Sequence, residues 1–103
     1  TSRIIPAMKV LLEGSATEPV IILQGDHGPW LQRGSGKFMV LNAYHLPGHN
    51  DLLYPTISPV NTFRLVLDTY LGGGYPLLED LSYYSPTPNI YEFELIENPC
   101  PVP

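Results

Sequence analysis

The sequence has few charged residues and very few basic ones. Of its 103 residues, 15% are charged, and five are Lys or Arg against ten Asp or Glu, so the formal net charge is −5. Binding to nucleic-acid phosphates needs a cluster of cations, which five scattered basic residues do not provide. We therefore expect no nucleic-acid partner. The hydrophobic fraction of 44% indicates a globular chain rather than a disordered one.

Long apolar runs and paired cysteines are also missing. No run approaches the roughly 18–20 apolar residues of a membrane span, so we expect no span in this chain, and no signal peptide is visible. The single Cys100 cannot form a disulfide within the chain and leaves the redox compartment open. The chain opens on Thr1 rather than Met, which we interpret as a processed or truncated product. The sequence alone does not determine the cellular compartment.

Proline and glycine, in contrast, are abundant, with twelve and nine residues. They divide the chain into short elements separated by irregular stretches. A length of 103 residues allows one domain at most, with a modest core. We expect residues 98–103, which include three prolines, to form a flexible tail.

The first two predicted elements are an amphipathic helix and a buried strand. An apolar stripe at helical spacing predicts a helix over residues 2–13 and consists of Ile4, Ile5, Met8, Leu11 and Leu12. Val20–Leu23 is apolar throughout, which predicts a strand buried on both faces, as in a parallel sheet. Such a pair is the second half of a βαβ unit whose first strand lies outside the chain. We therefore expect a missing N-terminal segment, or self-association, at the exposed edge beside Val20–Leu23.

The strand ends at Gly25, and Asp26 and His27 follow it directly. Ligands bind at the carboxyl ends of strands in open α/β sheets. A carboxylate and an imidazole side by side can serve as two ligands of a divalent metal. The alternative is a polar turn in which Asp26 caps a backbone N–H and His27 is solvated.

A glycine-rich polar loop, residues 30–37, separates this pair from a second predicted strand. The loop lacks the phosphate-binding G-x-x-x-x-G-K-[ST] pattern and precedes a strand, which favours a mobile surface loop over the edge of the site. Arg33 and Lys37 are the cations nearest to the Asp-His pair in sequence, and a site for an anionic ester would use such groups as clamps.

The second buried strand is predicted over Lys37–Leu46 and ends at Pro47. His45 and His49 are candidates for a third metal ligand. Nothing in their spacing directs either toward Asp26, so an ordinary polar role is the alternative.

A long helix and an aromatic C-terminal region complete the chain. Ser58 as N-cap and Pro59 at the first helical position predict a helix that ends at Leu71 before three glycines. Asn61 and Thr62, in its first turn, are expected to form local hydrogen bonds. Two alternating stretches, 81–84 and 91–96, predict short edge strands within an irregular aromatic wrap.

Three stretches together resemble a known family. VIILQGDHG, FMVLNAYHLPG and LYPTISPVNTFRLVLDTYLG are similar, in order and spacing, to the C-terminal part of sulfatase-like hydrolases and transferases of the alkaline phosphatase superfamily, in particular the lipoteichoic acid synthase-like group. The resemblance covers roughly residues 19–96. It implies that Asp26 and His27 are metal ligands. The family's N-terminal part, with the nucleophilic Thr or Ser and the other metal-binding acids, is absent from this sequence.

These observations predict an α/β segment: helix, buried strand, strand, helix, and an irregular aromatic C-terminal wrap with short strands. The resemblance implies that this segment is part of an alkaline-phosphatase-like sheet. Residues 1–103 would be one segment, the C-terminal part of a larger domain. The resemblance implies a metal-dependent phospho- or sulfo-ester hydrolase or transferase, extracytoplasmic as in that family and inactive alone. Its cofactor would be Zn²⁺, Mn²⁺ or Mg²⁺, held once other segments complete the site. The alternative is a small non-enzymatic α/β interaction module that binds a partner through its aromatic surface.

Overall fold

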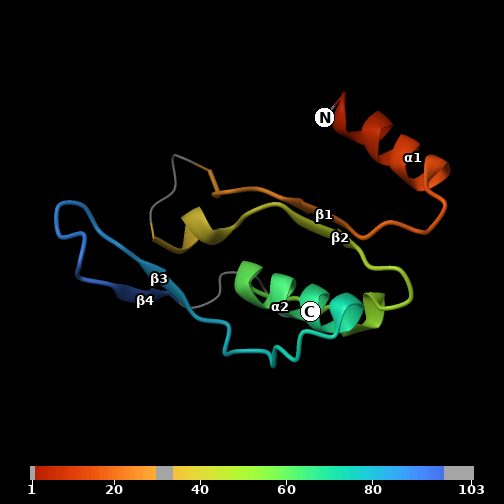
Figure 1. Cartoon of the computed structure of the whole chain (residues 1–103). Coiled ribbons are helices and arrows are strands. Elements are labelled where there is room, and N and C mark those ends of the chain that lie inside the picture. The colour runs from red at the N-terminus through yellow and green to blue at the C-terminus, as the bar shows by residue number, and fades with distance from the viewer. Residues whose placement is uncertain (1, 30–33, 97–103) are drawn as a thin grey trace.

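The computed structural model describes residues 2–29 and 34–96. Within these ranges the chain is a mixed α/β structure, with two α-helices and two small antiparallel two-stranded sheets (Figure 1). In chain order the elements are α1 (Ile4–Gly14), β1 (Ile21–Gln24), the 3₁₀ helix η1 (Gly34–Phe38), β2 (Asn42–His45), the 3₁₀ helix η2 (Asn50–Leu52), α2 (Pro59–Leu71), β3 (Ser82–Tyr84) and β4 (Glu94–Ile96). The predicted tail, 98–103, lies outside the described residues.

The first sheet corrects the expectation of a parallel neighbour for β1. β1 pairs antiparallel with β2, from Ile21 opposite His45 to Gln24 opposite Asn42. Three of its four residues are half-buried rather than buried on both faces. An apolar run indicates a strand but carries no information about the direction of its partner. In the described part of the chain, β2 is the one strand paired with β1, so the other edge of β1 is open.

The strand predicted over Lys37–Leu46 is shorter than expected. Its first two residues belong to η1, and the ladder with β1 begins only at Asn42. Glycines at positions 34 and 36 favour a tight turn here, and the N–H of Met39 bonds to the carbonyl of Gly36 at 3.3 Å. The surface loop expected over residues 30–37 is therefore a 3₁₀ helix from Gly34 onward.

The predicted N-terminal helix is confirmed as α1, which begins two residues later than expected and ends one residue later. Its apolar stripe is not covered: Met8 is half-buried and every other residue of α1 is exposed. Figure 1 shows α1 standing apart from α2 and from the β3–β4 sheet. A helix of 11 residues is marginal in water without tertiary packing.

The second predicted helix is confirmed as α2, with both of its predicted ends. The Oγ of Ser58 accepts a hydrogen bond from the Asn61 N–H at 3.3 Å, and Pro59 occupies the first turn. The helix stops at Gly72, whose left-handed φ of 62° suits glycine. Leu65 on this helix and Leu46 after β2 are the buried hydrophobic residues of the described chain.

Two hydroxyl contacts hold α2 along β2. The hydroxyls of Tyr44 and Thr62 lie 2.8 Å apart, and the Tyr70 hydroxyl donates to the carbonyl of Pro47 at 3.0 Å. Thr62 also makes the expected local bond, since its hydroxyl donates to the Ser58 carbonyl at 3.0 Å. α2 thus lies beside the first sheet, on the side of β2 (Figure 1).

The fully buried carboxamide of Asn61 connects α2 to a distant segment. Its Nδ2 donates to the carbonyl of Leu78 at 2.7 Å, and its Oδ1 accepts from the N–H of the same residue at 2.9 Å. Nδ2 also lies 2.9 Å from Oδ1 of Asp80 and 3.0 Å from the Tyr54 hydroxyl. We call this group, Tyr54, Ser58, Asn61, Leu78 and Asp80, the Asn61 clasp. It replaces the local role expected for the side chain of Asn61.

The C-terminal region forms the second sheet, separate from the first. β3 and β4 pair antiparallel from Ser82 opposite Ile96 to Tyr84 opposite Glu94, which confirms the two predicted short strands. Within residues 2–29 and 34–96, neither helix has the length and apolar character that a membrane crossing requires.

We expect Asn61→Ala to lower the free energy of unfolding by about 3 kcal/mol, because the N–H and carbonyl of Leu78 lose their partner in a partly buried setting. Urea unfolding followed by circular dichroism measures the change. The matched control is Asn89→Ala, which removes an exposed carboxamide bonded to Glu92 and should change the free energy by less than about 0.5 kcal/mol. Equal effects of the two substitutions would contradict a clasp at Asn61.

Candidate functional site

The turn after β1 is held against the segment that precedes β2. The N–H of Gly25 bonds to the carbonyl of Leu41 at 2.8 Å, and the N–H of Gly28 bonds to the carbonyl of Lys37 at 2.7 Å. Gly28 is buried, and a Cβ at this position would collide with the carbonyl oxygen of Gly36. Glycine at position 28 therefore allows the two backbones to approach, and this approach fixes the turn that carries Asp26 and His27.

Asp26 and His27 lie together on this turn. Nε2 of His27 is 3.8 Å from Oδ1 of Asp26, and the exposed fractions of the His27 and Asp26 side chains are 45% and 92%. Nδ1 of His27 lies 2.7 Å from the carbonyl oxygen of Gly28. A carbonyl can only accept, so Nδ1 carries a proton, and Nε2 is the ring nitrogen on the side of Asp26.

This geometry fits a pair of ligands to one divalent ion. Nitrogen and oxygen ligands lie about 2.0–2.2 Å from Zn²⁺, so two of them at a tetrahedral angle are roughly 3.4 Å apart. The observed separation of 3.8 Å is close to this value, and solvent reaches both side chains. Metal-bound histidines commonly donate their second ring N–H to a backbone carbonyl, as His27 does.

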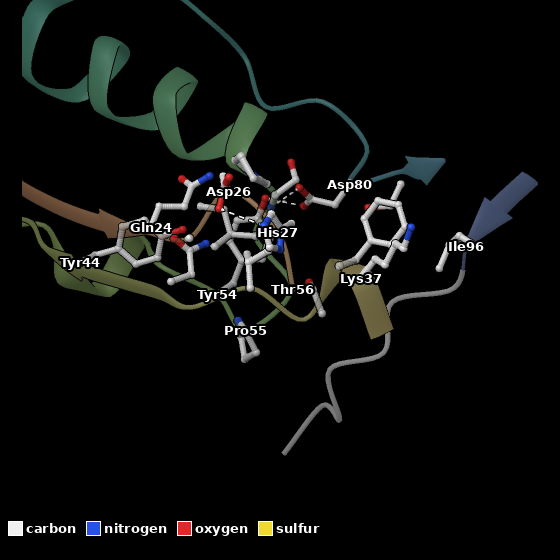
Figure 2. Close-up of a pocket in the computed structure, with 18 of the residues that line it drawn as sticks. Gln24, Asp26, His27, Lys37, Tyr44, Tyr54, Pro55, Thr56, Asp80 and Ile96 are labelled. Atoms are coloured by element: carbon white, nitrogen blue, oxygen red, sulfur yellow. Dashed lines mark hydrogen bonds and ion pairs between the residues drawn. The ribbon is translucent and has the colours of Figure 1, made fainter. Parts of the chain in front are cut away.

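The pair lies at one wall of a cleft of about 700 Å³, within the size range of small-molecule sites. The β1 end, from Gln24 to His27, forms this wall, and Leu53–Pro59 together with Asp80 lines the cleft as well. Figure 2 shows the labelled side chains of Asp26, His27 and Asp80 among those that line it. The cleft therefore brings the predicted metal pair together with part of the Asn61 clasp.

Asp80 is ionised and satisfied within the clasp. Its Oδ2 accepts from the Tyr54 hydroxyl at 2.5 Å, and its Oδ1 accepts from the Ser58 N–H at 2.7 Å. Burial disfavours its charge, but hydrogen bonds from Ser58, Tyr54 and Asn61 outweigh burial and hold the pKa of Asp80 below its usual value. Burial, followed by the hydrogen bond to Asp80, raises the pKa of the Tyr54 hydroxyl.

Of the two predicted cations, Lys37 lines the cleft. Its Nζ lies 5.5 Å from the centre of the Tyr84 ring, a cation–π contact between η1 and β3. Arg33, the other predicted clamp, lies outside the described residues. Lys37 thus lines the cleft while its ammonium group contacts the Tyr84 ring.

The structure does not bring His45 or His49 to the Asp-His pair. Nε2 of His45 lies 3.0 Å from Oε1 of Glu18, and the His49 ring stands edge-on to Tyr70 at 5.5 Å. Neither histidine lines the cleft. Across residues 2–29 and 34–96, no three His, Cys, Asp or Glu side chains gather as a metal-holding group. The pair on the turn would therefore be two ligands of a larger set.

Asn42 is a further polar residue of the cleft that sequence reasoning missed. It stands opposite Gln24 in the β1–β2 ladder and lines the cleft. Its Oδ1 is buried and has no hydrogen-bond partner among the described residues. Asn42 directly follows the apolar run Phe38–Leu41 in the predicted strand, and this position was the available signal.

The depressed pKa of Asp80 predicts a loss of stability in acid. The folded chain releases this proton at lower pH than the unfolded chain does, so the contribution is full above the unfolded pKa of about 3.9 and is lost as the pH falls through the folded pKa. Asp80→Asn should be about 2 kcal/mol less stable than the wild type at neutral pH, with a smaller gap in acid. Urea unfolding midpoints of the wild type and of Asp80→Asn, measured from neutral pH down into acid, give this difference in stability. The exposed Asp51→Asn should show no such narrowing, and a pH-independent gap for Asp80→Asn would contradict the assignment.

Comparison with known proteins yields no relative. Neither a scan against models of protein families nor searches of curated proteins and of solved structures finds a match to this chain.

Proposed function

We propose that this chain is the C-terminal part of an alkaline-phosphatase-like α/β domain and supplies Asp26 and His27 to the metal site of a phospho- or sulfo-ester hydrolase or transferase. The observation that carries the proposal is the arrangement of the pair. His27 is fixed by the Gly28 carbonyl in a tautomer that suits a metal ligand, with its Nε2 beside a carboxylate at the wall of a cleft. The resemblance of the surrounding stretches to sulfatase-like enzymes supports the same interpretation.

His27 Nε2 and Asp26 Oδ1 would hold a divalent ion, Zn²⁺, Mn²⁺ or Mg²⁺. When bound, such an ion supplies Lewis-acid polarisation of an ester oxygen and favours the deprotonated form of a hydroxyl nucleophile. The chain's own contribution is positional. The Gly28 carbonyl orients the imidazole, and the backbone bonds of Gly25 and Gly28 fix the turn in space.

Lys37 supplies the complementary charge for an anionic ester. Its side chain lines the cleft of a net-negative chain, where the ammonium group offsets the repulsion between an anionic substrate and the acids of the site. Arg33, close before Lys37 in the sequence, is the second proposed clamp. The Asn61 clasp keeps Asp80 engaged with Tyr54 and Ser58, which leaves Asp26 as the carboxylate available for the ion.

The remaining parts of the site come from another polypeptide segment. No Ser or Thr of the sequence has a recognisable activating base, so the nucleophile is not assigned to this chain. We propose that a missing N-terminal segment, or a further copy, adds along the open edge of β1, because unpaired backbone groups there accept another strand.

A second candidate is a non-enzymatic interaction module. It is favoured by the exposed aromatic residues of the C-terminal region, where Tyr83, Tyr91 and Phe93 are 52%, 85% and 64% exposed. Aromatic side chains are common anchors of protein interfaces. The two functions differ in whether His27 takes part in ligand binding.

We expect Zn²⁺ or Mn²⁺ to bind the 103-residue chain weakly, above the micromolar range, because two protein ligands hold an ion less firmly than three or four. Calorimetry measures the affinity, and NMR of the histidine rings under Zn²⁺ titration identifies the site. The His27 signals should shift first, and His27→Ala should abolish the heat of binding.

The matched control is His49→Ala, which removes an imidazole packed against Tyr70 and should leave the binding unchanged. Absence of any His27 shift would contradict the proposed function. Tight one-to-one binding that is lost with both His27→Ala and His45→Ala or His49→Ala would instead make this chain a complete metal centre.

We also expect the chain alone to hydrolyse aryl phosphate or sulfate esters no faster than the buffer with the same metal, because the nucleophile is supplied elsewhere. Steady-state assays with Zn²⁺, Mn²⁺ and Mg²⁺ measure this. Metal-dependent turnover that Asp26→Ala abolishes would show that the chain contains a nucleophile and would contradict the incomplete site.

A further inference from the structure

The β3–β4 sheet has one face toward the cleft and one toward solvent. Ser82 and Ile96, which stand opposite each other in the ladder, line the cleft. Side chains alternate between the two faces of a strand, so Tyr83 and its partner Leu95 lie on the other face, where they are 52% and 59% exposed. Phe93 is 64% exposed and lines a pocket of about 280 Å³ together with Tyr83. This outer face, Tyr83, Phe93 and Leu95, thus presents two aromatic rings around a pocket.

Aromatic rings in this part of the chain already contact cations. Nζ of Lys37 lies 5.5 Å from the centre of the Tyr84 ring, and the guanidinium carbon of Arg64 lies 5.8 Å from the centre of the Tyr75 ring. Both distances are within the roughly 6 Å of a cation–π contact. Among the residues that the structure describes, these are the two rings that a Lys or Arg covers. The pocket of the outer face therefore receives no cation from the described chain.

Every charged side chain after Arg64 is acidic. All five Lys and Arg residues lie between Arg3 and Arg64. The acids that follow Arg64 are Asp68, Glu79, Asp80, Glu92, Glu94 and Glu97. Two of them, Glu92 and Glu94, adjoin Phe93 in the chain, and both are exposed. The local charge and the aromatic faces therefore both favour a cation at the outer face and disfavour an anion.

Unpaired backbone groups at the sheet edges favour a peptide over a free cation. In the described part of the chain, β3 and β4 pair with each other alone, so each has one edge with unpaired N–H and C=O groups. An extended peptide adds to such an edge through its backbone. Every second side chain of that peptide then points to the same side of the sheet, so basic residues at alternate positions would all lie on the side of the outer face.

We infer that the outer face binds an extended basic segment of a partner protein, with a lysine or arginine side chain held between Tyr83 and Phe93. The carboxylates of Glu92 and Glu94 balance the charge of this segment, and its backbone pairs with an open edge of the sheet. The inference names the partner of the interaction module, the second candidate function, and rests on that function. It does not depend on the metal pair.

Calorimetric titration of the full chain with a blocked peptide of alternating arginine and valine tests the charge of the partner. It should bind about tenfold more tightly than the same peptide with glutamine in place of arginine, and added salt should reduce the difference. The double variant Glu92→Gln/Glu94→Gln should reduce it as well, whereas Glu13→Gln, which removes an acid from α1, should not. Equal affinities for the two peptides would leave an interaction module but overturn its basic partner. No binding of the arginine peptide would also overturn the inference.

A pair of aromatic substitutions tests the pocket. Phe93→Leu keeps an apolar side chain at the pocket but removes the ring, so it should weaken binding of the arginine peptide about fivefold. Tyr91 is 85% exposed and is not one of the two residues that line the pocket, so Tyr91→Leu should leave the affinity unchanged. NMR of the aromatic ring signals locates the peptide, and those of Tyr83 and Phe93 should shift first. Equal effects of the two substitutions, or binding without shifts at these two rings, would overturn the inference.

Discussion

The buried carboxamide of Asn61 is the interaction on which the described structure depends most. It satisfies both backbone groups of Leu78, and its Nδ2 also lies within hydrogen-bond distance of Asp80 and the Tyr54 hydroxyl. With two buried hydrophobic residues in the described chain, apolar packing alone gives little cohesion. Polar groups that are buried and mutually satisfied then determine how the segments meet, and a single truncation leaves several of them without partners.

The clasp has a consequence for chemistry as well as for stability. It holds Tyr54, Ser58 and Asp80 together, and these residues line the same cleft as the Asp-His turn. It also keeps both oxygens of the Asp80 carboxylate occupied by hydrogen-bond donors. The carboxylate beside the imidazole of His27 is that of Asp26. The cleft thus contains two carboxylates with different roles: Asp80 in the clasp, and Asp26 as the proposed metal ligand.

Local chemistry predicted the local parts of this structure. Helical spacing located α1, and the Ser58 cap and the glycines after Leu71 located both ends of α2. The position of Asp26 and His27 at the end of a strand was also predictable from the sequence. The antiparallel direction of β1 was not, because an apolar run does not specify its partner. Nor was the role of Asn61, whose partners are 17 and 19 residues away, although its place four residues before buried Leu65 puts it on the inner face of α2.

The central claim is that the turn carrying Asp26 and His27 binds a divalent ion. Paramagnetic relaxation by Mn²⁺, followed on backbone amide signals of the labelled chain, tests it most directly because it locates the ion. The account predicts that substoichiometric Mn²⁺ broadens the amides of Gly25 to Gly28 first, then those of Lys37 to Leu41, the segment that is hydrogen-bonded to the turn. Broadening that begins at the exposed acids Glu92 and Glu94, with the turn unaffected, would contradict it.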